Sequence, residues 1–460
     1  MATHNNALES CIAEFGKYLT ASQGAIFCGA GISRNSGIPL WSELLEEPRK
    51  ELGLPHGFPD APLLAQYFVN NARDGKRRLT KMIEASLKQG TGPSELHRLV
   101  AALPAAEFWT TNYDTYLEDA MSDADVRSKD DDLASDRPTG SKTVFKMHGS
   151  LHAGRLDLRR IVLTRDSYER YENEWPRMWA HLLSTFSSMS ILFLGFGFTD
   201  PNIEQIFRVA RVRFQGRARQ HFAVIRAPRR KTSLRVFEYQ VQELQRVGVG
   251  VVPIRAFDEI EGLLRRLLVV ARPPRVFVSG SYPDILWDAA CQRLGRALEA
   301  AQIEIMSGSS TAGRAVSYAA AAAARERGRY RPEVFTLFWR TVSREPVRLR
   351  ERLGTVKFLG NNYDELRSAL VREARALVVI GGREGTAQEV DLARAGGVPI
   401  VPIAATGGVA KNAWKRMIRQ RPMFGGRRVS QEQLRGLANP DVDRAVDAAV
   451  ELLKQAMYLR

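Results

Sequence analysis

The chain has few cysteines and no long hydrophobic run. Its 460 residues include three cysteines, Cys11, Cys28 and Cys291, which are far apart in the sequence. Three distant thiols can build neither a disulfide framework nor a four-cysteine zinc site, so we expect no metal. No apolar stretch reaches the roughly 18 to 20 residues of a membrane helix, and the polar N-terminus lacks a signal-peptide core. We therefore expect a cytoplasmic protein without a membrane partner.

Positive charge is concentrated in the C-terminal part of the chain. The net charge is +16, and residues 275–460 carry 30 lysines and arginines against 19 acidic residues. A basic surface can bind nucleic acid, but the sequence lacks the interleaved aromatic residues or the recognition motif that would support this partner. A ligand with several phosphates fits the charge better. An arginine-rich solvated surface nevertheless accounts for much of the excess.

Short apolar runs alternate with helical patterns in both halves of the chain. A length of 460 residues favours two domains, and this alternation is typical of parallel sheets covered by helices. The strands expected in the first half are 25–28, 108–111, 144–147, 191–194, 222–225 and 249–254. Those expected in the second half are 275–281, 303–306, 334–339, 377–380 and 399–403. We therefore predict an α/β fold of two Rossmann-like domains with mainly parallel sheets.

Other segments set the expected domain limits. Residues 41–103 are mostly helical in pattern and predict a helical insertion lobe in the first domain. The acidic stretch 118–141 predicts a solvated loop. A helix at 260–270 would close the first domain, and the consecutive prolines in 271–274 predict a short stiff linker. The predicted domains are residues 1–271 and 275–460.

Five short motifs in the first half carry a family resemblance. They are Gly29-Ala30-Gly31-Ile32-Ser33, Gly37-Ile38-Pro39, Thr110-Thr111-Asn112-Tyr113-Asp114, His148-Gly149 and Gly195-Phe196-Gly197. In this order and approximate spacing they resemble the NAD-binding fold of the sirtuin (Sir2) family. The resemblance implies that NAD+ is contacted by Gly29, Ala30, Gly31, Ser33, Asp114, Gly195 and Gly197. It also implies that Asn112 and His148 are catalytic.

The residue types suit these roles. A Gly-Ala-Gly turn lets backbone amides approach a pyrophosphate, and the hydroxyl of Ser33 can add a donor. The resemblance implies that Asn112 holds a ribose hydroxyl or a water beneath the anomeric carbon, and that Asp114 accepts from the nicotinamide carboxamide. Taken alone, an Asn-x-Asp sequence after a strand is also typical of a capping turn.

An imidazole can exchange protons near neutral pH, which makes His148 the candidate base or water-positioning group. His152, four positions later, is the alternative. Asp200 either caps the following helix or takes part in the site, and the sequence favours neither.

Two departures from the sirtuin pattern decide which reaction we expect. Protein-deacylating sirtuins have a four-cysteine zinc module after the catalytic histidine, and Asp-Phe-Arg where this chain has Leu40-Trp41-Ser42. A peptide-binding cleft is therefore in doubt, whereas cleavage of the glycosidic bond needs only a held NAD+ and a nucleophile such as water. We expect hydrolysis of NAD+ to nicotinamide and ADP-ribose. Protein deacylation, ADP-ribosyl transfer, and a nucleotide or nucleic-acid sensor with an inactive first domain stay as alternatives.

A second glycine signature, 381–389, follows the apolar run Val378-Val379-Ile380 and resembles that of the SLOG superfamily, which includes cytokinin-activating phosphoribohydrolases. The hydrolase version commonly has Pro-Gly-Gly and one residue fewer before Gly-Thr, so the departure favours binding over hydrolysis. A structural turn is the alternative. Guanidinium groups match phosphates bidentately, and Glu389 could accept from a ribose hydroxyl. The candidate effector-binding residues are Ser281, Ser309, Arg340, Lys357, Arg367, Arg372, Gly382, Thr386 and Glu389.

The order of the two modules is itself informative. A Sir2-like domain followed by a SLOG-like domain resembles the effectors of the Thoeris bacterial anti-phage system. This resemblance implies a ligand-gated NAD+ hydrolase, activated by a cyclic ADP-ribose isomer that a partner TIR-domain protein makes. It further implies a homotetramer or a larger assembly.

Overall fold

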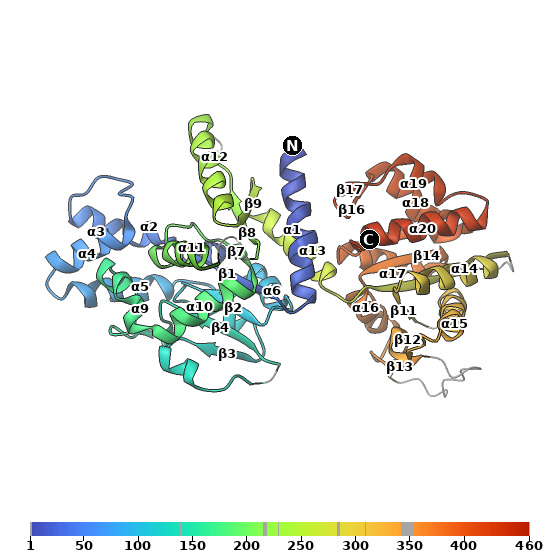
Figure 1. Cartoon of the computed structure of the whole chain (residues 1–460), viewed down its shortest axis with the longest axis horizontal. Coiled ribbons are helices and arrows are strands. Elements are labelled where there is room, and N and C mark those ends of the chain that lie inside the picture. The colour runs from blue at the N-terminus through green and yellow to red at the C-terminus, as the bar shows by residue number, and fades with distance from the viewer. Residues whose placement is uncertain are drawn as a thin grey trace. The chain divides into compact units, whose positions relative to one another are not determined.

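The computed structural model describes residues 2–138, 140–214, 219–228, 230–282, 286–308, 310–341 and 354–459. The chain divides into two compact units, Met1–Leu267 and Leu268–Arg460, each built around one large parallel sheet (Figure 1). The α/β fold class predicted from the sequence is confirmed. Ser309 lies outside the described residues. In the described part of the chain, none of the helices combines the length and the apolar character that crossing a bilayer requires.

The first unit contains a seven-stranded sheet in the order β3-β4-β2-β1-β7-β8-β9, with every neighbouring pair parallel. Its strands are β1 (Gly24–Cys28), β2 (Glu107–Thr110), β3 (Ala124–Arg127), β4 (Lys142–Lys146), β7 (Ser190–Leu194), β8 (His221–Arg226) and β9 (Val249–Ile254). Every residue of β1, β2 and β7 is buried, because helices cover both faces of the sheet. The surrounding helices are α1 (Ala2–Thr20), α7 (Tyr116–Asp119), α8 (Arg165–Glu169), α9 (Tyr171–Glu174), α10 (Pro176–Ser188), α11 (Pro201–Phe214), α12 (Lys231–Arg246) and α13 (Asp258–Val270). A small hairpin joins β5 (Leu151–His152) to β6 (Arg155–Leu156).

The predicted helical lobe is inserted between β1 and β2. It consists of α2 (Trp41–Leu44), α3 (Glu46–Glu51), α4 (Ala61–Asn71), α5 (Gly75–Leu87) and α6 (Glu95–Ala102). In Figure 1 the helices α2 to α5 extend away from the sheet, whereas α6 lies beside it. The lobe has its own core, in which Phe68 and Ile83 pack with Tyr113 and Tyr116 from the segment after β2. The lobe therefore supports the loop that carries Asn112 and Asp114.

The prediction of a solvated loop at 118–141 is wrong. This segment contains the edge strand β3, which pairs in parallel with β4, and a 3₁₀ helix at Asp130–Ala134. The acidic composition misled the prediction because several of the carboxylates are used locally. Asp132, for example, accepts hydrogen bonds from the backbone N–H groups of Ser128 and Lys129.

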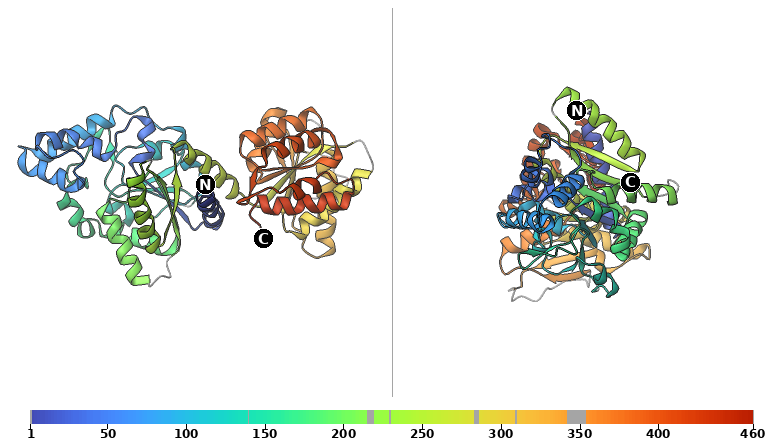
Figure 2. Two further views of the ribbon diagram at one scale, coloured as in Figure 1. Left: turned by 90° about the horizontal axis from the view of Figure 1, so that it is seen from above. Right: turned by 90° about the vertical axis from the view of Figure 1, so that its left-hand side faces the viewer.

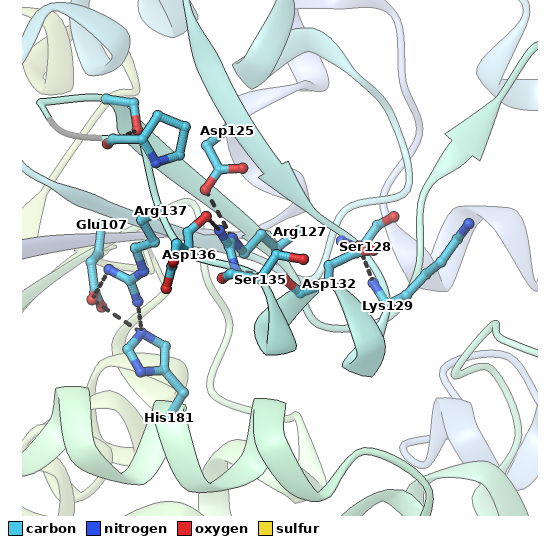
Figure 3. Close-up of polar contacts among 12 residues, drawn as sticks. Glu107, Asp125, Arg127, Ser128, Lys129, Asp132, Ser135, Asp136, Arg137 and His181 are labelled. Atoms are coloured by element: carbon cyan, nitrogen blue, oxygen red, sulfur yellow. Dashed lines mark hydrogen bonds and ion pairs between the residues drawn. The ribbon is translucent and has the colours of Figure 1, made fainter.

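A buried arginine organises the same segment. The side chain of Arg127 is only 4% exposed and forms an ion pair of 2.8 Å with Asp125. It also donates to the backbone oxygens of Asp132, Ser135 and Asp136, as Figure 3 shows. One guanidinium thus satisfies three carbonyl groups of an irregular chain, which explains why the segment is ordered.

A second cluster in Figure 3 surrounds Glu107, the first residue of β2. Its carboxylate accepts from Arg137 at 2.9 Å, His181 at 3.0 Å and Thr185 at 2.8 Å. Burial acts to raise the pKa of Glu107, but the hydrogen bonds and positive charge of these partners outweigh it and lower the pKa to about 2. This cluster lies at the amino end of β2, opposite the edge where Asn112 emerges.

The second unit contains a six-stranded parallel sheet in the order β13-β12-β11-β10-β14-β15. Its strands are β10 (Arg275–Ser281), β11 (Glu304–Ser307), β12 (Phe335–Trp339), β13 (Thr355–Phe358), β14 (Ala376–Gly381) and β15 (Ile400–Ile403), with a hairpin of β16 (Met423–Phe424) and β17 (Arg427–Arg428). Its helices are α14 (Leu286–Ala300), α15 (Thr311–Glu326), α16 (Tyr363–Glu373), α17 (Glu384–Ala395), α18 (Gly408–Gln420), α19 (Gln431–Gly436) and α20 (Val442–Ala456). Helices cover both faces of this sheet (Figure 2), and alternate residues of β10 enter separate cores. The edge strand β13 was not predicted, because it is short and partly exposed.

Both sheets have a point at which the strand order changes direction. In the first unit β1 lies between β2 and β7, and in the second β10 lies between β11 and β14. The loops that follow the two strands at such a switch point run to opposite sides of the sheet, and ligands of α/β proteins bind in the crevice they leave. Both glycine signatures of the sequence fall at these points.

Candidate functional site

Glycines bring two loops of the first unit into close contact at the switch point. The N–H groups of Gly29 and Gly31 donate to the backbone oxygens of Leu194 and Gly195, both at 2.9 Å. A Cβ atom on Gly29 would lie 2.6 Å from the oxygen of Gly195, and one on Gly31 would lie 2.8 Å from its Cα. Gly195 itself has a φ of +60°. Glycine is therefore required at all three positions by the close approach of the backbones.

These bonds limit which backbone N–H groups of the turn can contact a pyrophosphate. Besides Gly29 and Gly31, Ile32 and Ser33 also use their N–H groups, to the oxygens of Gly29 and Ala30. Among the described backbone bonds of the turn, none is donated by Ala30, so its amide is the one left for a ligand. Gly197 differs from the others, since an added Cβ would meet only Thr199 Oγ1, at 3.9 Å. Contact of these glycines with NAD+ stays a prediction.

Asn112 is held in a defined orientation just beyond β2. Its side-chain nitrogen Nδ2 donates to the backbone oxygen of Gly29 at 3.3 Å and to Ser33 Oγ at 3.2 Å. A carbonyl oxygen can only accept, so the amide atom facing Gly29 must be the nitrogen. Both amide hydrogens are thereby committed. The oxygen Oδ1 is the group that Asn112 can offer to a ligand or a water.

Ser33 lies at the centre of this buried network. It is 0% exposed, and its Oγ donates to Asp114 Oδ2 at 3.0 Å while it accepts from Asn112. His97 Nε2 lies 3.2 Å from the same oxygen. The other carboxylate oxygen of Asp114 accepts from the N–H of Tyr116 at 3.2 Å. The single hydroxyl proton of Ser33 is directed at Asp114. Ser33 therefore holds Asn112 and Asp114 in place, and the sequence analysis did not predict these contacts.

The structure brings Asn112 and His148 to the same edge of the sheet. Thr110 at the end of β2 pairs with Lys146 at the end of β4, and each candidate follows two residues later. Neighbouring strands are about 5 Å apart, so the two side chains start from adjacent positions. Gly149, immediately after the histidine, has a φ of +94°, which favours glycine there.

His148 is almost completely enclosed. Its ring is 3% exposed and packs edge to face with Tyr168 at 5.2 Å between ring centroids. Its Nε2 lies 3.3 Å from Asp200 Oδ2, without the alignment of a hydrogen bond. Burial lowers the pKa of His148 and outweighs the opposing effect of the Asp200 charge. His148 is therefore neutral at pH 7 and able to accept a proton.

Asp200 makes both of the contacts that the sequence left open, one as a helix cap and one with His148. Its Oδ1 accepts from the N–H groups of Asn202 and Ile203 at 3.0 and 3.2 Å and so caps α11. Its Oδ2 faces His148. The alternative histidine, His152, is exposed and contacts Ser128 Oγ at 3.2 Å, away from this network.

A buried lysine supports the same loop and was missed because it lies inside a predicted strand. Lys146 is 0% exposed, and its Nζ donates to Glu118 Oε1 at 2.7 Å. It also donates to the backbone oxygen of Asp114. Lys146 thus ties the segment after β2 to the end of β4.

The switch point of the second unit is also built on glycines. Gly382 N–H donates to the oxygen of Ser281 at 2.9 Å, and Gly381 N–H donates to Thr406 Oγ1 at 2.7 Å. A Cβ on Gly382 would lie 2.6 Å from Thr386 Cγ2, in the first turn of α17. The signature therefore fits a tight passage from β14 into a helix.

Charged candidates gather beside this turn around an aromatic ring. The guanidinium groups of Arg340 and Arg367 lie 4.1 and 5.3 Å from the ring centre of Tyr363, which is 55% exposed. Arg367 Nε is 3.8 Å from Glu389, which also accepts from Ser279. Burial raises the pKa of Glu389 against the opposing effects of Ser279 and Arg367. Sequence reasoning did not select Tyr363.

Two basic candidates are not brought into this group. Lys357 is exposed on β13 and lies 3.8 Å from Glu373. Arg372 is exposed five residues after Arg367 on α16, a spacing that places it on a different face of the helix. Their contact with an effector stays a prediction.

Two family models match the chain, one mainly in each unit. Residues 106–244 match the SIR2-like domain, and residues 259–456 match the Sir2- and TIR-associating SLOG family. The chain is 28% identical over 464 residues to the NAD(+) hydrolase ThsA of Cytobacillus dafuensis, covering 91% of this chain and 89% of that protein. Along most of its length the chain is therefore similar to ThsA.

Two more relatives match over shorter regions. The proteins named NAD(+) hydrolase ThsA from Enterococcus faecium and Bacillus cereus (strain MSX-D12) are 30% and 32% identical over 294 and 292 residues. These alignments cover 59% and 60% of this chain, and span 61% and 60% of the two relatives. Among the described residues, no group of three or more His, Cys, Asp and Glu side chains could hold a metal ion.

Proposed function

We propose that this ThsA-like chain hydrolyses NAD+ to nicotinamide and ADP-ribose at the switch point of its first unit. The observation that carries the proposal is the placement of Asn112 and His148 at adjacent positions on one edge of the sheet. The names of its relatives, NAD(+) hydrolase ThsA, support the same reaction.

The oriented side chains suggest how the bond is cleaved. Asn112 presents Oδ1, which can hold a water or a ribose hydroxyl beneath the anomeric carbon. The N-glycosidic bond breaks with its electron pair leaving on nicotinamide, and a water oxygen bonds to the oxocarbenium-like carbon. Neutral His148 accepts the proton of that water, and the facing Asp200 carboxylate stabilises the imidazolium. Asp114, fixed by Ser33, accepts from the carboxamide.

We propose that the second unit controls this reaction by binding a cyclic ADP-ribose isomer. Such a ligand carries phosphates, a base and ribose hydroxyls, which match the guanidiniums of Arg340 and Arg367, the exposed ring of Tyr363 and the carboxylate of Glu389. The name of the matched family, Sir2- and TIR-associating, supports a TIR-domain protein as the source of the ligand. We further propose that the chain forms a homotetramer or a larger assembly. It acts in anti-phage defence in the cytoplasm.

A nicotinamide-release assay on the full chain tests the reaction, with and without a panel of cyclic ADP-ribose isomers. We expect release of nicotinamide and ADP-ribose that rises with one of the isomers. The Asn112→Ala variant should lose release by about 100-fold or more, whereas Asn70→Ala, at an exposed position of the helical lobe, should match the wild type. Unchanged turnover in Asn112→Ala would remove this residue from the mechanism. Formation of O-acyl-ADP-ribose from an acylated peptide would instead support a deacylase.

A further inference from the structure

A buried histidine that the sequence analysis did not select contacts the network around Ser33. His97 lies on α6 of the helical lobe and is 0% exposed. It does not belong to the glycine turn or to the strand ends that carry the candidate residues. Its ring packs edge to face with Tyr116 at 5.7 Å, and its Nε2 faces Ser33. Buried polar groups normally form hydrogen bonds, so the partners of this ring indicate its role.

The hydrogen bonds of His97 determine which ring nitrogen carries the proton. The backbone N–H of Ser94 donates to His97 Nδ1 at 3.1 Å, and the Ser94 hydroxyl, which can donate as well, lies 2.9 Å from the same nitrogen. A backbone N–H can only donate, so Nδ1 must be unprotonated, and the proton of the neutral ring must be on Nε2. His97 Nε2–H therefore donates to Ser33 Oγ over 3.2 Å.

The other bonds around Ser33 agree with a donor at His97 Nε2. The serine oxygen has two lone pairs, and these accept from His97 Nε2 and Asn112 Nδ2. Its own proton must then be donated to Asp114, at 3.0 Å. Without the bond from His97, one lone pair of Ser33 would be free, and the hydroxyl could rotate away from Asp114. Of the two acceptors that orient the amide of Asn112, the oxygen of Gly29 would stay fixed, but Ser33 Oγ would be less constrained.

We propose that His97 is a positioning residue for NAD+ cleavage, which acts through Ser33 to hold the amide of Asn112 and the carboxylate of Asp114 in their reactive orientations. This inference rests on the proposed function. It also links the helical lobe to the reaction centre, since α6 delivers a donor to the loop after β1.

The ring is suited to this role because it stays neutral. Burial lowers the pKa of His97, the nearby Arg98 lowers it further, and the Asp114 charge acts to raise it. At pH 7 the ring keeps Nδ1 as an acceptor for Ser94 and Nε2 as a donor for Ser33. Among these neighbours Arg98 is exposed and Asp114 is buried.

Two substitutions separate the hydrogen bond from the packing. His97→Phe keeps a ring against Tyr116 but removes the donor, and should lower kcat for NAD+ by about 10- to 100-fold with little change in KM. His97→Gln retains an amide donor that can reach Ser33, and should recover most of the lost kcat. His56→Phe, at an exposed position of the same lobe, is the matched control and should behave as the wild type. Equal loss in the Phe and Gln variants, with thermal midpoints that fall together, would reduce His97 to a structural role.

A double-mutant cycle tests whether His97 acts through Ser33. In a Ser33→Ala background the Nε2 donor has no acceptor, so adding His97→Phe should cost little further activity. Additive losses in kcat would overturn the proposal. A wild-type chain that releases no nicotinamide with any cyclic ADP-ribose isomer would defeat the proposed function instead.

The hydrogen bond from His97 to Ser33 can also be tested without measuring NAD+ turnover. NMR of the full chain labelled with ¹⁵N-histidine distinguishes protonated from unprotonated ring nitrogens, and His97→Phe identifies the signal by its disappearance. We expect neutral His97 with the proton on Nε2 at pH 7. A proton on Nδ1, or a charged ring, would overturn the inference.

Discussion

Both units have a parallel sheet with a switch point, but the chemistry of the two switch points differs. In the first, Asn112, Ser33, Asp114 and His97 are buried and interlocked by hydrogen bonds. In the second, guanidinium groups surround the half-exposed ring of Tyr363. Buried donors and acceptors with fixed directions suit bond cleavage, whereas accessible cations suit the binding of phosphates. The same backbone frame thus serves a candidate reaction in one unit and candidate recognition in the other.

Glycine has the same task in both places. Gly29 and Gly31 approach Gly195 in the first unit, and Gly381 approaches Ser281 in the second. Each signature therefore marks where two loops diverge at a switch point. The side chains delivered by neighbouring strands and helices decide what happens there.

The largest effect should come from the histidine of the first site. His148→Ala removes the proposed proton acceptor and should lower NAD+ turnover by about 100- to 10,000-fold. The matched control is His152→Ala, since His152 is exposed and outside the network. Nicotinamide release measured with both variants at saturating isomer checks this prediction. A larger loss in His152→Ala would exchange the roles of the two histidines.

The next largest effect concerns the buried lysine under the first site. Lys146→Met leaves Glu118 buried without its partner and should destabilise the first unit by about 3 to 5 kcal/mol. The double variant Lys146→Met/Glu118→Leu should recover much of this loss, because no buried charge is left unpaired. Urea unfolding of the three proteins measures the difference. Equal stability of the single variant and the wild type would show that the pair contributes nothing.

A smaller effect is expected at the second switch point. Arg367→Ala should raise the isomer concentration needed for half-maximal NAD+ cleavage by about tenfold or more, because a charge-assisted bond to phosphate is lost. Arg372→Ala, on another face of the same helix, should change this concentration little. Activation curves for both variants provide the measurement. The reverse ranking would move the effector to the other side of α16.

The smallest effect is a pH dependence of stability at the amino end of β2, opposite the edge that carries the candidate site of the first unit. The pKa of Glu107 is about 2 in the folded chain, below the roughly 4.3 of an unfolded glutamate. The unfolded state therefore binds more protons, and stability present above about pH 4.3 is lost as the pH falls towards 2. Glu107→Gln should flatten this part of the urea-midpoint profile, whereas Glu432→Gln, at an exposed position, should not. Parallel profiles for Glu107→Gln and the wild type would contradict the assignment.

Sequence patterns predicted much of this architecture, and their failures have physical causes. Buried runs such as 25–28 and 191–194 are apolar throughout, so the central strands were readily found. The edge strand β3 was missed, because it is polar and partly exposed, and Arg127 holds it to carbonyl groups later in the chain. The amino-acid composition of a segment does not reveal such a contact.

The candidate site was also predicted only in part from the sequence. The ends of β2 and β4 could be predicted, and with them the shared edge of Asn112 and His148. The bonds from Ser33 to His97 and Asp114 could not, since they join residues 64 and 81 positions apart. Distances of this kind are set by how the lobe packs on the sheet.

The most direct test of the central claim is a crystal structure of the full-length His148→Ala variant with bound NAD+. The account predicts that NAD+ crosses the switch point between β1 and β7, with the nicotinamide ribose beside Asn112 Oδ1 and residue 148. NAD+ bound with this ribose away from both positions, or bound only in the second unit, would contradict it.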